Sequence, residues 1–260
     1  MFFNLNGNFW SILGNIWYML GGFLNNIYFS IIAIFFGFVG GFFLACLQFV
    51  NKEKLSARIS NAIVSFVCGT PMVVQLMIYY YVVPSVIPIS NMLSAVLGVA
   101  FNSACYFSLI FLDAMSAIDD TYFLNLRGLN VSKSVSIKKF LLPMVINNSY
   151  NKITFEFVSL LKETAILNTI GVSDIFSRAK EMAWQSGSSY VYMFVCAGIF
   201  YITYIIHKNF FHKFINPLLV GLLKFVLRTS NLMLLLYSSM GYLLYAICAR
   251  LVVVFRHVYL

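Results

Sequence analysis

The chain consists largely of apolar runs that are long enough to cross a lipid bilayer. It has 260 residues, of which 61% are apolar and only 10% are charged. Soluble domains carry about 25% charged and about 45–50% apolar residues, so this composition excludes an ordinary soluble domain. A membrane-spanning helix needs roughly 20 apolar residues, which leaves room for about five or six spans. The sequence therefore predicts an all-α integral membrane protein.

Polar segments divide the chain into parts. Residues 1–25 carry no charge, and Trp10 and Trp17 suit a segment at the membrane interface, although a weak extra span would also fit. Residues 26–212 hold the predicted transmembrane domain, in which glycines at 37, 40 and 41 would allow close helix contact. We expect its spans at 28–50, 59–83, 91–112, 155–170 and 190–206.

Residues 213–260 form a hydrophobic tail with two interpretations. The stretch 231–248 is apolar enough to be a sixth span, which would return the C-terminus to the outer side. It could equally be a helix that lies along the membrane surface. The predicted core therefore has five spans, with the sixth left open.

The basic residues alternate between the loops. Excess Lys and Arg stay on the cytoplasmic side of a membrane. The loops at 51–58, 113–152 and 207–228 hold 3, 5 and 4 of them, whereas those at 84–90 and 173–188 hold none and 2. This pattern predicts an N-terminus outside and a cytoplasmic loop at 113–152. It also accounts for the net charge of +9 without nucleic acid as a partner.

The chain shows no pattern that is typical of an enzyme or a metal site. Its five cysteines are scattered without a CxxC pair, and its three histidines all follow residue 206. A phosphate-binding GxxxxGK[ST] loop is absent, so any ATP-driven activity would need a separate ATPase. We therefore expect no catalytic residue, no metal and no cofactor bound by this chain.

Three short motifs follow one another along the predicted spans. They read GTPMVVQL at 69–76, ACY at 104–106, and LLKET at 160–164 followed by IGV at 170–172. Together they resemble the inner-membrane permease subunits of ABC importers for polar amino acids, of the histidine/glutamine type. That family has Arg-Gly-Thr-Pro-x-x-x-Gln-Leu, Ala-Ala-Tyr and Leu-Leu-Lys-Asp-Thr at these places. Cys68 stands where the family has the arginine.

The resemblance implies a type I ABC importer core in the bacterial inner membrane, which translocates a polar amino acid by alternating access. It implies several partners: cytoplasmic ABC ATPase subunits that use ATP and Mg, a second permease subunit, identical or related, an extracytoplasmic amino-acid-binding protein, and membrane lipid. The alternative is a decayed permease or a non-transporting scaffold that still binds partners.

The resemblance also places an ATPase-coupling helix at 121–132. Thr121 suits its N-cap, while Tyr122, Leu126 and Leu129 would form an apolar stripe. Gly128 and Asn130 would end the helix, because asparagine tolerates a left-handed turn. The family's Glu-Ala-Ala falls on 124–126, its glycine on Asn130 and its loop proline on Pro143. The predicted coupling residues are Thr121, Tyr122, Leu124, Asn125, Leu126, Gly128, Asn130 and Pro143. An ordinary amphipathic helix packed on its own subunit is the alternative.

Six residues of the motifs are candidates for the substrate path: Thr70, Gln75, Tyr106, Lys162, Glu163 and Thr164. Pro71 removes a backbone donor and is expected to break the helix beside Thr70. Gln75 could bond a substrate or only another helix. Lys162 and Glu163 are adjacent and cannot pair on a helix, so each needs its own partner. The pair either lines the path or lies at its cytoplasmic mouth and serves packing.

Overall fold

The structure is a computed structural model that describes residues 5–50, 54–132, 135–187 and 190–207. Within these ranges every regular element is a helix, which confirms the predicted all-α class. The tail at 213–260 lies outside the described residues, so a sixth span stays a prediction. The elements in order are α1 (Leu5–Val50), α2 (Leu55–Gly69), α3 (Met72–Met77), the π-helix η1 (Ile78–Val82), α4 (Val83–Val86), α5 (Asn91–Ser116), α6 (Asp120–Gly128), the π-helix η2 (Ser136–Leu141), α8 (Leu142–Glu163), the 3-10 helix η3 (Thr164–Ile170), α9 (Ile175–Ser186) and the helix Tyr190–His207.

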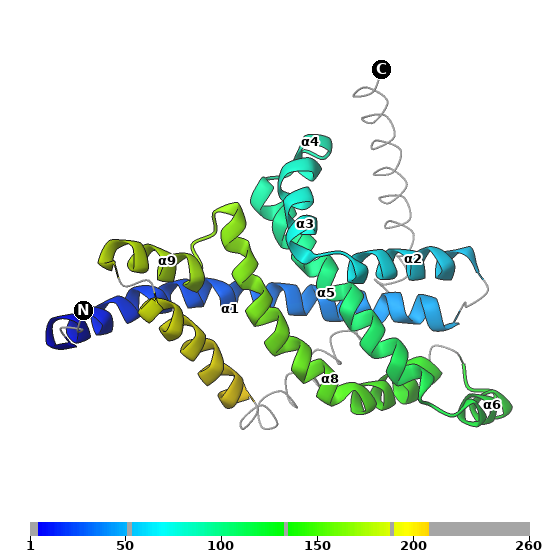
Figure 1. The fold of residues 1–260 in the computed structure, drawn as a ribbon. Coiled ribbons are helices and arrows are strands. Elements are labelled where there is room, and N and C mark those ends of the chain that lie inside the picture. The colour runs from blue at the N-terminus through cyan, green and yellow to red at the C-terminus, as the bar shows by residue number, and fades with distance from the viewer. Residues whose placement is uncertain (1–4, 51–53, 133–134, 188–189, 208–260) are drawn as a thin grey trace, which may run out of the picture.

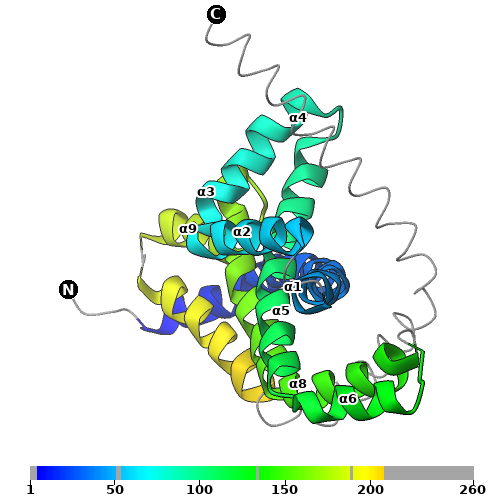
Figure 2. The same cartoon turned by 90° about the vertical axis from the view of Figure 1, so that its right-hand side faces the viewer.

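The long helix α1 packs against α2, α5, α8, η3 and α9, and α5 crosses it (Figure 1). In the view along α1, α3 and α4 lie at one end of the molecule and α6 at the opposite end (Figure 2). Figure 1 shows the same arrangement. The loops around α4 and α6 were predicted on opposite membrane sides, and the fold separates them accordingly.

A seam of small residues brings α1 and α5 together, as the glycine spacing predicted. A side chain at Gly41 would lie 2.7 Å from the Ala104 carbonyl oxygen and 2.9 Å from the Ser108 amide nitrogen. Beside this seam Phe38 packs edge-on against Phe111, with ring centres 5.1 Å apart. The two backbones therefore approach closely, and the aromatic rings fill the adjoining core.

Two predicted spans agree closely with the structure. Asn91–Ser116 and Tyr190–His207 are long and apolar enough to cross a membrane, where we expected spans at 91–112 and 190–206. A third such helix is Leu13–Phe49, which extends the expected span at 28–50 toward the N-terminus. α1 runs unbroken from Leu5 to Val50, so the boundary expected between residues 25 and 26 falls inside one helix, at a point where Asn25 and Asn26 bond to a distant part of the chain.

The other two expected spans are built differently. The span at 59–83 divides into Leu55–Gly69 and Met72–Val86, which are bent by 106° relative to each other. The span at 155–170 divides at Glu163, where α8 ends and the tighter 3-10 helix η3 begins. α8 also begins earlier, at Leu142, because Pro143 suits the first turn of a helix, where an amide donor is not required.

We predict that Gly41→Ala destabilises the protein by about 1–3 kcal/mol, because the added methyl group must push the α5 backbone away from α1. Gly14→Ala on the same helix is the matched control, since nothing lies within 4 Å of a side chain there. That change should be neutral or stabilising by up to about 1 kcal/mol through helix propensity. Thermal unfolding in detergent, followed by circular dichroism, measures both. Equal effects of the two changes would contradict the close seam.

Candidate functional site

The break between α2 and α3 is closed by the side chain of Gln75. Thr70 and Pro71 adopt extended backbone angles, with ψ of 146° and 132°. Pro71 has no N–H to donate to the carbonyl oxygen of Val67, its helical partner. The Gln75 amide nitrogen donates to that oxygen at 2.7 Å and to the Thr70 hydroxyl at 2.7 Å. Gln75 therefore replaces the hydrogen bond that the proline removes.

Helix α5 completes this arrangement through Asn102. The Asn102 amide nitrogen donates to the Gln75 side-chain oxygen at 3.0 Å, and both side chains are buried. The amide nitrogen and the amide oxygen of Gln75 therefore both bond to the protein. This agrees with the alternative in which Gln75 bonds another helix and not a substrate. Asn102 was not among the predicted residues. The signal that could have identified it is an amide inside an apolar span, directly before the ACY motif.

Two carboxylates of α8 face the region around Tyr106. Tyr106 is half-buried and close enough to Glu156 and Glu163 for electrostatic interaction. Glu156 is only 9% exposed, and no described Lys or Arg forms an ion pair with either glutamate. The Ser159 hydroxyl donates to Glu163 at 3.2 Å. A buried carboxylate without a cation is costly, so this cluster can accept a positively charged group.

Lys162 and Glu163 have separate surroundings, as expected for neighbours on a helix. Lys162 is exposed, and its ammonium nitrogen lies 5.9 Å from the centre of the Phe155 ring. Glu163 is half-buried beside Ser159. Thr164 is fully buried and contacts Asn26 of α1. The structure thus directs three consecutive candidates to three different environments.

The predicted coupling segment contains the short helix α6. Its cap is Asp119, because the Asp119 carboxylate accepts a hydrogen bond from the Thr121 amide at 2.9 Å. Thr121 therefore lies inside the first turn, and the prediction that it is the N-cap was wrong. The same hydrogen bond holds the pKa of Asp119 below its usual range. Gly128 ends the helix and Asn130 has a φ of 56°, the left-handed turn that was predicted.

The faces of α6 differ from the predicted stripe. Leu126 is 8% exposed and Tyr122 packs against the core, so these two residues hold α6 to its own subunit. Leu129 lies past the helix end and is 74% exposed. Leu124 is 61% exposed, and Asn125 is exposed beside it. The outward surface is thus the part of α6 that a partner could contact. Pro143 is separate from it, in the first turn of α8.

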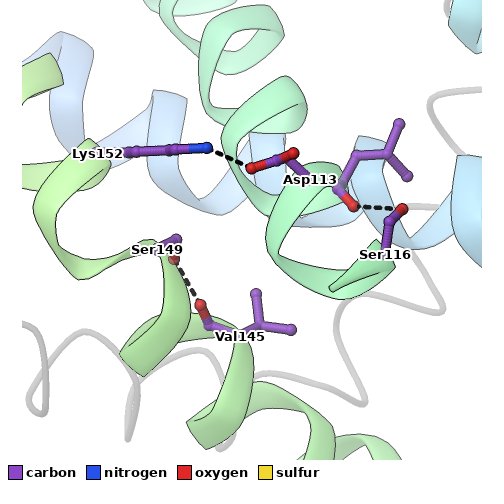
Figure 3. A network of polar contacts seen from close by, with 6 residues as sticks. Asp113, Ser116, Val145, Ser149 and Lys152 are labelled. Atoms are coloured by element: carbon purple, nitrogen blue, oxygen red, sulfur yellow. Dashed lines mark hydrogen bonds and ion pairs between the residues drawn. The ribbon is translucent and has the colours of Figure 1, made fainter. Parts of the chain in front are cut away.

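An ion pair joins the two helices at the base of this segment. Figure 3 shows the Lys152 ammonium group of α8 bonded to the Asp113 carboxylate of α5. Asp113 was expected in the loop, but it lies in the last turn of α5. Ser149 and Ser116 donate to carbonyl oxygens of their own helices, at 2.6 Å and 2.9 Å. Since both charged side chains are exposed, the pair contributes only about 0–1 kcal/mol.

The arrangement offers no metal site among the described residues, because no three His, Cys, Asp or Glu side chains come together there. What it does offer is a broken helix, a carboxylate cluster between α5 and α8, and a short helix with an exposed face at one end of the molecule. These are features of a membrane protein that moves a solute, and comparisons with known proteins agree.

Residues 33–221 match the family described as binding-protein-dependent transport system inner membrane component. The chain belongs to this family of inner-membrane, multi-pass ABC transporter permeases. It is 32% identical over 183 residues to the putative glutamine transport system permease protein GlnP of Rickettsia typhi, which covers 70% of this chain and 84% of that protein. It is 29% identical over 195 residues to the probable amino-acid permease protein YxeN of Bacillus subtilis, with 72% and 86% covered.

Solved structures show the same fold. An amino acid ABC transporter crystallised with histidines superimposes with a TM-score of 0.70 at 21% identity, covering 80% of this chain and 96% of that one. The inward-facing MetNI methionine ABC transporter gives a TM-score of 0.59 at 17% identity, covering 75% and 94%. The resemblance inferred from the three motifs is confirmed at the level of the family.

We predict that Gln75→Met destabilises the protein by about 1–3 kcal/mol, because Asn102 loses its acceptor in a buried site and Val67 keeps only the longer hydrogen bonds from Thr70. Gln185→Met is the matched control, since Gln185 is exposed and bonds only Glu181 within its own helix. Thermal unfolding in detergent compares the two variants. Equal melting temperatures would show that Gln75 does not hold the break.

Proposed function

We propose that this chain is the permease subunit of an ABC importer that carries a polar amino acid across the bacterial inner membrane by alternating access. The observation that carries the proposal is the family match at 33–221, which includes the helix break, α6 and the carboxylate cluster. The named relatives support the substrate class: besides glutamine transport, they include the arginine transport system permease protein of Bacillus subtilis, 33% identical over 150 residues.

The carboxylates indicate which end of the substrate this chain would contact. Every amino acid carries an ammonium group, and Glu156 and Glu163 lack a described cationic partner. An ammonium group that approaches these side chains would be stabilised by charge-assisted hydrogen bonds. Tyr106 lies beside them and Thr70 lies at the helix break, so these two remain candidates for the path. Lys162 is exposed and suits the mouth of the path better than its interior.

The free energy for transport would come from ATP hydrolysis by a partner protein, and α6 is the element through which this chain would contact that partner. A separate cytoplasmic ATPase that hydrolyses ATP with Mg would dock on the exposed face formed by Leu124, Asn125, Gly128 and Leu129. ATP binds the two states of the transporter with different affinity, and this difference shifts the equilibrium between them. A second permease subunit, identical or related, would complete the path. An extracytoplasmic binding protein would deliver the amino acid on the opposite side.

The decisive test is uptake by lipid vesicles that contain this chain, its ATPase and its binding protein. ATP-dependent uptake of a labelled polar amino acid, with glutamine and arginine compared, is expected. A stable complex that hydrolyses ATP but takes up no amino acid would instead indicate a scaffold.

We predict that Leu124→Asp abolishes coupling, because a charge replaces an exposed apolar contact on α6. Leu124 is 61% exposed, so the folded chain should tolerate the change. Val135→Asp is the matched control, an exposed apolar position outside α6, in helical conformation directly before η2. Co-purification of the ATPase and substrate-stimulated ATP hydrolysis are the measurements. If Leu124→Asp behaves like Val135→Asp, α6 is not the docking element.

We predict that the loop after α6 faces the cytoplasm and the loop before α5 faces the outside. Ser132 is exposed in the loop after α6, and Ser85 is exposed in the short helix α4, which precedes the loop before α5. Cysteines placed there, in a background without the native cysteines, are labelled in intact cells with a membrane-impermeant maleimide. Labelling at residue 85 but not at residue 132 until the cells are opened is expected. The reverse pattern would invert the proposed orientation.

A further inference from the structure

A buried polar cluster joins α1 to the segment that follows the Lys162–Glu163 pair. The Asn26 amide nitrogen donates to the Thr164 hydroxyl at 3.2 Å. The Asn26 side-chain oxygen accepts a hydrogen bond from the Ile175 amide at 3.1 Å. The Ser30 hydroxyl donates to the Asn26 carbonyl at 2.7 Å and lies 3.4 Å from the Thr164 hydroxyl. All three polar side chains, those of Asn26, Ser30 and Thr164, are buried.

The two bonds of Asn26 hold both ends of one irregular segment. Thr164 begins the 3-10 helix η3, and Ile175 begins α9. Between them the chain turns at Gly171, which has a φ of 83°. η3 has hydrogen bonds of its own, whereas residues 171–174 between η3 and α9 are not helical. One side chain of α1 thus contacts both the start of η3 and the start of α9.

Close backbone contact secures the same junction. A side chain at Gly22 would lie 2.6 Å from the Asp174 carbonyl carbon and 2.8 Å from the Ile175 nitrogen. The Asn25 amide nitrogen donates to the Ser173 carbonyl at 2.8 Å. α1 therefore contacts the start of α9 at several residues. Through Thr164, Asn26 connects this junction to the end of α8.

We propose that Asn26 and Thr164 are a positioning pair that fixes the end of α8, and with it the Glu163 carboxylate, for transport. The inference rests on the proposed function. Thr164 follows Glu163 directly and is the C-cap residue of α8, so a displacement of Thr164 would also move the end of α8. The fully buried Thr164 hydroxyl donates to the Leu161 carbonyl oxygen of α8 at 2.8 Å and accepts from Asn26 of α1, so it links the end of α8 to α1.

The two partners meet in apolar surroundings. Leu167 and Ile170 beside it belong to a buried hydrophobic cluster that includes Ala33 of α1. A polar group in such surroundings gains more from a matched partner than it would in water. Without the Thr164 hydroxyl the Asn26 amide nitrogen loses its hydrogen-bond acceptor. Without the Asn26 amide the Thr164 hydroxyl keeps its bond to the Leu161 carbonyl oxygen of α8 but loses the bond from that side chain of α1, so either change loosens the link between the two helices.

The test measures uptake by vesicles with Thr164→Val, which keeps the shape and removes the hydroxyl, and with Thr164→Ser, which keeps the hydroxyl. The matched control is Ser149→Ala: Ser149 is a fully buried residue of the same helix whose hydroxyl bonds only α8 carbonyls. KM and maximal rate are normalised to folded protein, and melting temperatures are recorded. A double-mutant cycle adds Asn26→Leu, alone and combined with Thr164→Val.

We expect Thr164→Val to lower uptake by about tenfold or more, because small displacements of positioned groups are costly. Thr164→Ser should stay within about threefold of the wild type, and Ser149→Ala likewise. The double variant should be no slower than the slower single one, since the two residues act as a unit. Three results would overturn the pairing but not the proposed function. They are a wild-type uptake rate for Thr164→Val, a loss of uptake that less folded protein explains, and additive effects of the two substitutions. No uptake by the wild type would overturn the proposed function as well.

Discussion

A backbone carbonyl inside a membrane must find a donor within the protein, and this requirement governs where the helices of the chain can be interrupted. At Pro71 the donor is lost, and the amide of Gln75 supplies it to the Val67 oxygen. The break is therefore an ordered bend of 106° rather than a frayed end. Because Asn102 of α5 holds Gln75 in turn, the direction of α3 depends on where α5 lies.

The position of α5 depends on α1. The glycines of α1 let the α5 backbone approach, and the buried phenylalanines beside the seam fix the contact. The same helix carries Asn26, which holds the start of η3 and the start of α9. One helix thus sets the position of both interruptions, the bend after α2 through α5 and the segment after α8 directly. A displacement of α1 or α5 is expected to move the carboxylates of α8, since α8 packs on both helices.

The sequence predicted those features that depend on local chemistry. Uninterrupted apolar runs predicted the helices that the structure has at 91–116 and 190–207. Pro71 predicted the break between α2 and α3, and Asn130 predicted the left-handed turn after α6. Features that depend on distant partners were missed. The contacts of Asn25 and Asn26 were not predicted, because their partners lie about 140–150 residues later. The cap of α6 was placed on Thr121, but the carboxylate of Asp119 accepts a hydrogen bond from the Thr121 amide and so caps the helix two residues earlier.

The candidate residues now divide by whether their hydrogen-bonding capacity is already used. Gln75 bonds the backbone, Thr70 and Asn102, and Thr164 bonds α1, so neither has an obvious group left for a solute. Glu156 and Glu163 differ, since no described cation pairs with either of them. A membrane interior penalises an uncompensated carboxylate far more than an amide with its partners in place. The amides and hydroxyls therefore serve contacts between the helices, whereas the two carboxylates are groups whose charge no described cation balances.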